Sequence, residues 1–112
     1  MTTYATAFSA LADRTRREIL ESLATGELSV GQIASRLPVS RPATSQHLRV
    51  LEEARLVTVR IDGRRRLYRL CTDGLEPLRT YLNRFWEVAL NRFRMTAEQI
   101  VREGGSVDEI QS

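Results

Sequence analysis

The chain has 112 residues, a single cysteine and a net charge of +3, and all 17 of its basic residues are arginine. This length fits one domain, and a domain of this size buries only about two-thirds of the surface that its unfolded chain exposes. The sequence has no run of about 18 apolar residues, which excludes a membrane-spanning helix. The first ten residues lack the features of a secretion signal, and the lone Cys71 excludes an intramolecular disulfide. We therefore expect a soluble, cytoplasmic protein with no membrane contact.

The positive charge is concentrated in the middle of the chain. Residues 36–69 hold nine arginines and three acidic residues, whereas both flanking segments are net acidic. A basic block of this kind is expected where a protein contacts phosphate backbones. Charge alone, however, fits a solvated surface equally well.

Hydrophobic spacing and capping residues predict three helices in the first third of the chain, over about 3–12, 14–24 and 29–37. Asp13 is placed to cap the second helix. Ser29 and Gln32 have the capping-box spacing at the start of the third helix, and Pro38 is expected to end that helix.

A fourth helix is predicted over 41–54, with Ser40 as its N-cap. Only a short turn separates it from the third helix, which is the helix-turn-helix outline. Thr44, Leu48, Leu51 and Arg55 share one face at helical spacing. The opposite face is rich in hydrogen-bonding groups and carries Pro42, Gln46, Arg49 and Glu53, with Ser45 at its edge.

A β-hairpin is predicted over 56–70, because alternating β-branched residues precede Asp62-Gly63, a strong two-residue turn signal. That turn would place Val59 opposite Arg66 and Val57 opposite Tyr68. The tip would then carry the arginines at positions 60, 64, 65 and 66. Because like charges repel, we expect a ligand to bring the compensating negative charge.

A long helix is predicted over 73–102, and its apolar residues form more than one stripe. One stripe can cover the core of the chain itself, so the surplus suggests a second packing partner. Residues 103–112 are expected to be a flexible tail. The expected organisation is one domain over 1–102, mainly α with a small β-hairpin, in the order α-α-α-α-β-β-α.

Three segments resemble the ArsR/SmtB family of bacterial regulators: 11–20 in the second helix, 39–51 at the fourth helix and 63–70 in the hairpin. The Ser-x-x-x-x-Ser-Gln-His-Leu pattern of residues 40–48 is the most specific of these. The resemblance implies a winged helix-turn-helix fold and a homodimer built from the first and last helices. It also implies binding to an operator, usually to repress transcription, that changes when an effector binds.

The sequence departs from this family at the positions of the family's familiar metal sites. The family's metal sensors have cysteines at the positions of Ser29 and Gly31, or histidine with acidic residues on the last helix, and the only histidine here is His47. The chain thus resembles the non-metal branch, and neither a metal nor another cofactor is expected. A small-molecule effector, and its identity, are left open.

Candidate DNA-binding residues follow from the hairpin and from the fourth helix, which is the recognition helix of the helix-turn-helix. The amide of Gln46 can pair with an adenine edge, whereas Arg49 can either read guanine or hold a phosphate. For His47 a phosphate contact and simple packing at the helix edge are equally weighted. The full set is Ser40, Arg41, Pro42, Ser45, Gln46, His47, Arg49, Arg64, Arg65 and Arg66.

Candidate dimerisation residues come from the first and last helices. They are Tyr4, Phe8, Leu11, Leu78, Tyr81, Leu82, Phe85, Trp86, Val88 and Ala89. We expect a sequence-specific regulator that binds an inverted-repeat operator, and repression is favoured over activation.

Two other classes of function are less well supported by the sequence. An enzyme is disfavoured because the sequence has no nucleophile pair, glycine-rich phosphate loop or metal-ligand cluster. The stronger alternative is a winged-helix module that binds protein instead of DNA. Such a module should expose aromatic residues or leucine on the outer face of the fourth helix.

Overall fold

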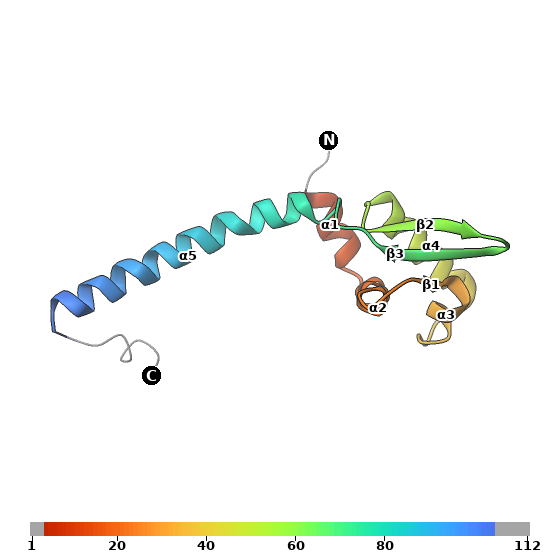
Figure 1. The fold of residues 1–112 in the computed structure, drawn as a ribbon, viewed down its shortest axis with the longest axis horizontal. Coiled ribbons are helices and arrows are strands. Elements are labelled where there is room, and N and C mark those ends of the chain that lie inside the picture. The colour runs from red at the N-terminus through yellow and green to blue at the C-terminus, as the bar shows by residue number, and fades with distance from the viewer. Residues whose placement is uncertain (1–3, 105–112) are drawn as a thin grey trace. The chain divides into compact units, whose positions relative to one another are not determined.

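The computed structural model describes residues 4–104. They divide into a compact unit that ends at Arg79 and a second unit that begins at Thr80. In chain order the elements are α1 (Tyr4–Leu11), α2 (Arg14–Leu23), β1 (Leu28–Ser29), α3 (Val30–Ala34), α4 (Arg41–Glu53), β2 (Val57–Asp62), β3 (Arg65–Leu70) and α5 (Glu76–Arg102) (Figure 1). This is a winged helix-turn-helix, as predicted. Within the described range, no helix is both long and apolar enough to cross a membrane.

The three predicted N-caps are confirmed. The Asp13 carboxylate accepts a hydrogen bond from the Arg16 backbone N–H at 3.0 Å, and this bond lowers the pKa of Asp13. The Ser29 hydroxyl and the Gln32 amide satisfy each other's backbone N–H groups at 3.2 and 2.8 Å. The Ser40 hydroxyl accepts from the Ala43 N–H at 3.2 Å. These caps satisfy backbone donors that the first turn of a helix leaves unpaired.

The third helix is shorter than predicted. It ends at Ala34, so the turn of the helix-turn-helix spans 35–40 instead of beginning at the proline. The chain leaves the helix through tight turns in which the Arg36 and Leu37 N–H groups donate to the Ile33 and Ala34 carbonyls. Leu37 still packs against the core, which explains its place in the helical pattern.

The core lies between the helices and the sheet of the first unit. The predicted inner face of α4 is confirmed for Thr44, Leu48 and Leu51, which are fully buried. Arg55, the fourth residue predicted on this face, lies beyond the end of the helix and is exposed. Thr44 satisfies its hydroxyl by donating to the Ser40 carbonyl at 3.0 Å. The largest other fully buried side chains are Ile19, Ile33, Leu56 and Val57.

The end of α4 is tightly constrained. Arg55 has a left-handed backbone, with φ of 62°, and its N–H donates to the Glu52 carbonyl while the Leu56 N–H donates to the Leu51 carbonyl. This is a Schellman ending, which usually has glycine where Arg55 stands. Gly74 packs directly against the ending, since its N–H donates to the Arg55 carbonyl at 2.8 Å. The approach is so close that a Cβ at position 74 would overlap the backbone of this turn.

The sheet has three antiparallel strands in the order β1-β3-β2, so β3 is central. β1 was not predicted, because two residues carry no periodic signal. It pairs with β3 through Leu28 opposite Tyr68. In Figure 1 the β2–β3 hairpin projects as the wing, with β1 alongside β3.

The predicted hairpin register is wrong by two residues. The strands are joined by Gly63-Arg64, with φ of 63° at Gly63, and Asp62 pairs with Arg65. Val59 therefore lies opposite Tyr68 instead of Arg66. This register pairs Val57 with Leu70, Val59 with Tyr68 and the acid Asp62 with the base Arg65 across the strands. A shift of two keeps every side chain on its predicted face.

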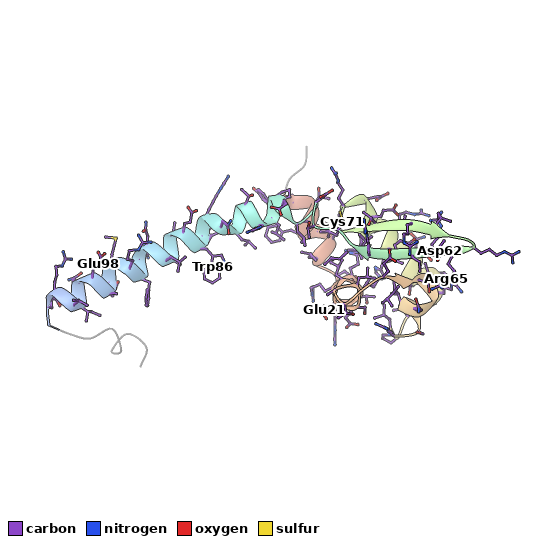
Figure 2. The ribbon with its side chains drawn as sticks, in the orientation of Figure 1. Glu21, Asp62, Arg65, Cys71, Trp86 and Glu98 are labelled. Atoms are coloured by element: carbon purple, nitrogen blue, oxygen red, sulfur yellow. The ribbon has the colours of Figure 1, made fainter. Side chains whose placement is uncertain are left out.

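The last helix begins at Glu76, three residues later than predicted. The Thr72 carbonyl accepts from the Leu75 and Glu76 N–H groups, and the Asp73 carboxylate instead lies 3.5 Å from the Arg55 guanidinium. Within the unit that begins at Thr80, α5 exposes many large apolar side chains. Trp86, which is 61% exposed, stands out from this helix (Figure 2).

Candidate nucleic-acid interface

The outer face of α4 is polar and free to meet a ligand. Burial of the opposite face fixes the rotation of the helix, so its outward residues are Arg41, Pro42, Ser45, Gln46 and Arg49, all of which are exposed. Pro42 lies in the first turn, where its missing N–H is tolerated. Within the described residues, the Gln46 amide has no hydrogen-bond partner. The face thus presents unpaired donors and acceptors near the start of the helix.

This face does not resemble a protein-binding surface. In α4, which the structure describes in full, Val50 is the only large hydrophobic residue that is exposed, and it is 37% exposed. A protein-binding module should expose aromatic residues or leucine there. The observed face therefore favours nucleic acid over protein.

His47 lies half-buried at the edge of the recognition helix. Its Nδ1 is 3.5 Å from Nη1 of Arg16. The same guanidinium donates to the Ala10 carbonyl at 2.7 Å and to the Ser9 carbonyl at 3.2 Å, at the end of α1. His47 thus has a polar neighbour in Arg16, and its two predicted roles, a phosphate contact and packing at the helix edge, both stay predictions.

The wing carries three exposed arginines near its tip. Arg64 is in the turn, Arg65 lies opposite Asp62, and Arg66 lies opposite Ile61. Asp62 and Arg65 are both drawn on the hairpin in Figure 2. Within residues 4–104, none of the three guanidinium groups forms an ion pair with a carboxylate.

Arg60 differs from the other wing arginines, because its guanidinium already has an acidic partner. It lies further down β2 and forms an ion pair with Glu27, with N–O distances of 2.9, 3.0 and 3.2 Å. The Arg60 guanidinium lowers the pKa of Glu27, and Glu27 in turn raises the pKa of Arg60. The pair joins the segment before β1 to β2 across the central strand, so the charge of Arg60 is already compensated.

Two hollows lie between the recognition helix and the wing. The larger, of about 390 Å³, is the arginine pocket, lined by Ser29, Val30, Gly31, Arg41, Arg64, Arg65 and Arg66. The smaller, of about 170 Å³, is lined by Val30, Ser45, Arg49, Glu52, Arg66 and Tyr68. The two hollows share Val30 and Arg66, and their combined lining holds five arginines and one acid, Glu52. The sequence alone did not place residues 29–31 there, because only the fold brings them to the wing.

The candidate dimerisation residues fall into two groups. Leu78 is buried and Leu11 packs against the core, so both already contribute to the first unit. Tyr4 and Phe8 are exposed on α1 and contact each other edge to face. On α5, Tyr81 is half-buried, whereas Leu82, Phe85, Trp86, Val88 and Ala89 are exposed. The exposed apolar surface also extends further along α5, to Leu90, Phe93, Met95 and Val101.

Ser29 and Gly31, which stand where the metal sensors have cysteines, both line the arginine pocket. Among residues 4–104, no three His, Cys, Asp or Glu side chains come together where they could hold a metal ion. Indifference to metal stays a prediction. The expected tail falls mainly on 105–112, outside the described residues.

Comparison with known proteins gives a consistent result. A model of the family "Bacterial regulatory protein, arsR family" matches residues 13–59. The HTH-type transcriptional regulator Rv2034 of Mycobacterium tuberculosis is 56% identical over 98 residues, which cover 88% of this chain and 89% of that protein. The transcriptional repressor SdpR of Bacillus subtilis is 36% identical over 69 residues, or 62% of this chain and 77% of that protein.

Solved structures agree with the sequence comparison. The crystal structure of a protein described as "Possible transcriptional regulator for arsenical resistance" superposes with a TM-score of 0.65 at 47% identity. The match covers 80% of this chain and 94% of that one.

Proposed function

Because the chain belongs to the ArsR family of DNA-binding transcriptional regulators, we propose that it binds an inverted-repeat operator as a homodimer and represses transcription. The family consists of regulators and not of enzymes. The observation that carries the proposal is the polar outer face of α4 beside three wing arginines that have no carboxylate partner among the described residues. Bacterial DNA lies in the cytoplasm, so we place the protein there.

Base reading falls to the exposed start of the recognition helix. The Gln46 amide can pair with the N6 and N7 edge of adenine through two hydrogen bonds, and Ser45 and Arg49 lie beside it. We assign Ser40 and Arg41 to a backbone phosphate, because both are exposed at the positive end of the helix dipole and the Arg41 guanidinium is cationic. The backbone contributes little, since Pro42 has no N–H and the Ala43 N–H already donates to Ser40. The buried inner face of α4 fixes which side chains reach the groove.

The wing is proposed to contact the sugar-phosphate backbone of the DNA. Arg64, Arg65 and Arg66 supply charge beside the recognition helix, which suits phosphate contacts or the minor groove. Arg60 does not take part, because its guanidinium is engaged by Glu27. Specificity therefore comes mainly from α4, and affinity comes mainly from the wing and the helix start.

A second copy of the chain is the partner proposed for the exposed apolar residues. The part of α5 beyond Thr80 exposes apolar groups along most of its length, and α1 exposes Tyr4 and Phe8. Leaving so many large apolar groups in water is unfavourable, and monomeric proteins seldom do so. We assign operator binding and dimerisation to a single domain over 1–102. Two-fold symmetry then requires an inverted repeat with half-sites about 34 Å apart.

Selection of bound sites from random duplex DNA by the purified protein tests the proposal. The expected result is an inverted repeat, together with a dimer in sedimentation at micromolar concentration without DNA. Recovery of no preferred sequence, or a monomer under these conditions, would contradict it. A reporter gene behind the recovered site tests the direction of regulation: repression predicts lower expression when the protein is present, and higher expression would refute that part.

A further inference from the structure

The arginine pocket gathers more positive charge than a single backbone contact needs. Four guanidinium groups line it, from Arg41 at the start of α4 and from the three arginines of the wing, and no carboxylate lines it. Its remaining wall is the junction of β1 and α3, including Ser29 and Gly31. The pocket is therefore built from three separate segments that fold together.

The charge of this pocket is not compensated by the rest of the described chain. Among residues 4–104, none of the four arginines has an ion pair, whereas Arg60 on the same hairpin has one with Glu27. Two acids lie beside these arginines: Asp62, opposite Arg65 at the end of the ladder, and Glu52, which lines the adjoining hollow with Arg66. Two carboxylates cannot balance four cations, so a ligand with negative charge is favoured there.

We propose that the arginine pocket is a phosphate-binding site, and that operator DNA and a free multiply charged phosphate exclude each other from it. Guanidinium groups present paired N–H donors that match phosphate oxygens. A backbone phosphodiester carries one negative charge, whereas pyrophosphate carries several on adjacent groups and so matches the four cations better. The exclusion of DNA rests on the proposed function, but the binding of the anion does not.

Gly31 allows the pocket to be filled without removal of an arginine. A Cβ built at this position would lie 3.9 Å from Cζ and Nη1 of Arg41, which is ordinary contact distance. An aspartate there would place its carboxylate in the pocket beside that guanidinium. Gly31 is the second residue of α3, where an acidic side chain also suits the helix start. Gly31→Asn is the matched control, because it has nearly the same shape and no charge.

The first experiment is calorimetric titration of the full chain with pyrophosphate, without DNA or magnesium. We expect binding by the parent protein. Binding should be about tenfold weaker or worse in Arg41→Gln, which is the loss expected when one charge-assisted hydrogen bond is removed. We expect a similar loss in Gly31→Asp, because its carboxylate would occupy the Arg41 guanidinium and repel the anion. Gly31→Asn should stay within about threefold of the parent. No binding by the parent, or equal losses in the Asp and Asn variants, would overturn the proposal.

The second experiment measures the affinity for a selected duplex by fluorescence anisotropy, with pyrophosphate or with sodium chloride of equal ionic strength. Pyrophosphate should weaken DNA binding by the parent more than the chloride does, and this excess should be lost in Gly31→Asp. Equal effects of the two salts on the parent would overturn the exclusion. If the protein binds pyrophosphate but selects no duplex, the proposed function fails and the anion site stands. If it selects a duplex but does not bind pyrophosphate, the proposed function stands and the anion site is refuted.

Discussion

Arg64 and Arg60 lie on the same hairpin, yet only one of them should affect how DNA binding depends on salt. Arg64 has no carboxylate partner within residues 4–104, whereas Arg60 is held by Glu27 through N–O distances of 2.9 to 3.2 Å. Binding to DNA releases a counterion for each phosphate that the protein neutralises. An arginine that already neutralises a carboxylate contributes little to this release.

The size of the effect depends on how many phosphates the variant no longer neutralises. Arg64→Gln should reduce the slope of log K against log salt by about 0.9, or by about 1.8 when both subunits of a dimer carry the substitution. Between about 50 and about 200 mM salt, a slope change of about 1.8 alters the ratio of parent to variant affinity by roughly tenfold. The control is Glu27→Gln combined with Arg60→Gln, which keeps the net charge and removes the compensated pair. Its slope should stay close to that of the parent.

The assay is a salt titration of DNA binding on a selected duplex and on a scrambled one. Thermal unfolding of each variant comes first, because the Glu27–Arg60 pair also joins β2 to the segment before β1, and the variants must be folded to be compared. The reasoning is refuted if the folded double variant loses as much slope as Arg64→Gln. It is also refuted if Arg64→Gln leaves the slope unchanged.

The remaining predictions concern base reading, packing, backbone strain and metals. Gln46→Ala should lose about 1–3 kcal/mol of discrimination between bases at one position of each half-site, and its DNA binding should depend on salt as that of the parent does. If the ratio of affinities for the selected and the scrambled duplex is unchanged, Gln46 does not recognise a base. Gly74→Ala should lower the free energy of unfolding by about 1–3 kcal/mol, because its Cβ would overlap the Ala54 carbonyl. Gly31→Ala is the control, because its Cβ would have room, and it should change that free energy by less than about 1 kcal/mol. If denaturant titrations show equal losses in the two variants, the close approach of Gly74 to the Ala54 carbonyl is unimportant for stability. Arg55→Gly should be more stable than Arg55→Ala by about 1 kcal/mol, since both lose the same ion pair and only glycine relieves the left-handed backbone; the opposite order would refute the strain. Zinc, cadmium and arsenite should leave operator binding unchanged, and release of the DNA together with micromolar metal binding would refute the assignment to a non-metal branch.

The sequence by itself determined the features that depend on neighbouring residues. Asp13, Ser29 and Ser40 cap helices through hydrogen bonds to a residue three positions ahead, so each cap can be recognised within four letters. The buried face of α4 follows from helical spacing alone. These local signals were sufficient for the helix-turn-helix, the wing and the direction in which Gln46 points. The ArsR resemblance rested on the same segments, and the comparisons confirm it.

Only the tertiary structure decided the features that join distant segments. The hairpin register depends on matching Val59 with Tyr68 and Asp62 with Arg65, and a turn signal that fits two adjacent positions cannot choose between them. Leu28 and Ser29 form the strand β1 because they pair with β3, which is distant in the sequence. The helix α3 can end at Ala34 because Leu37 packs against the core from the turn that follows.

The electrostatics of the wing were also decided by the fold. In the sequence, the arginines at positions 60, 64, 65 and 66 are equivalent charges in one basic block. In the structure, Glu27 compensates Arg60, whereas the other three share a pocket with Arg41. Charge acts through space, so its effect depends on which side chains the packing brings within a few ångströms. A sequence gives the number of charges in a segment, and only the folded chain determines which of them are left for a ligand.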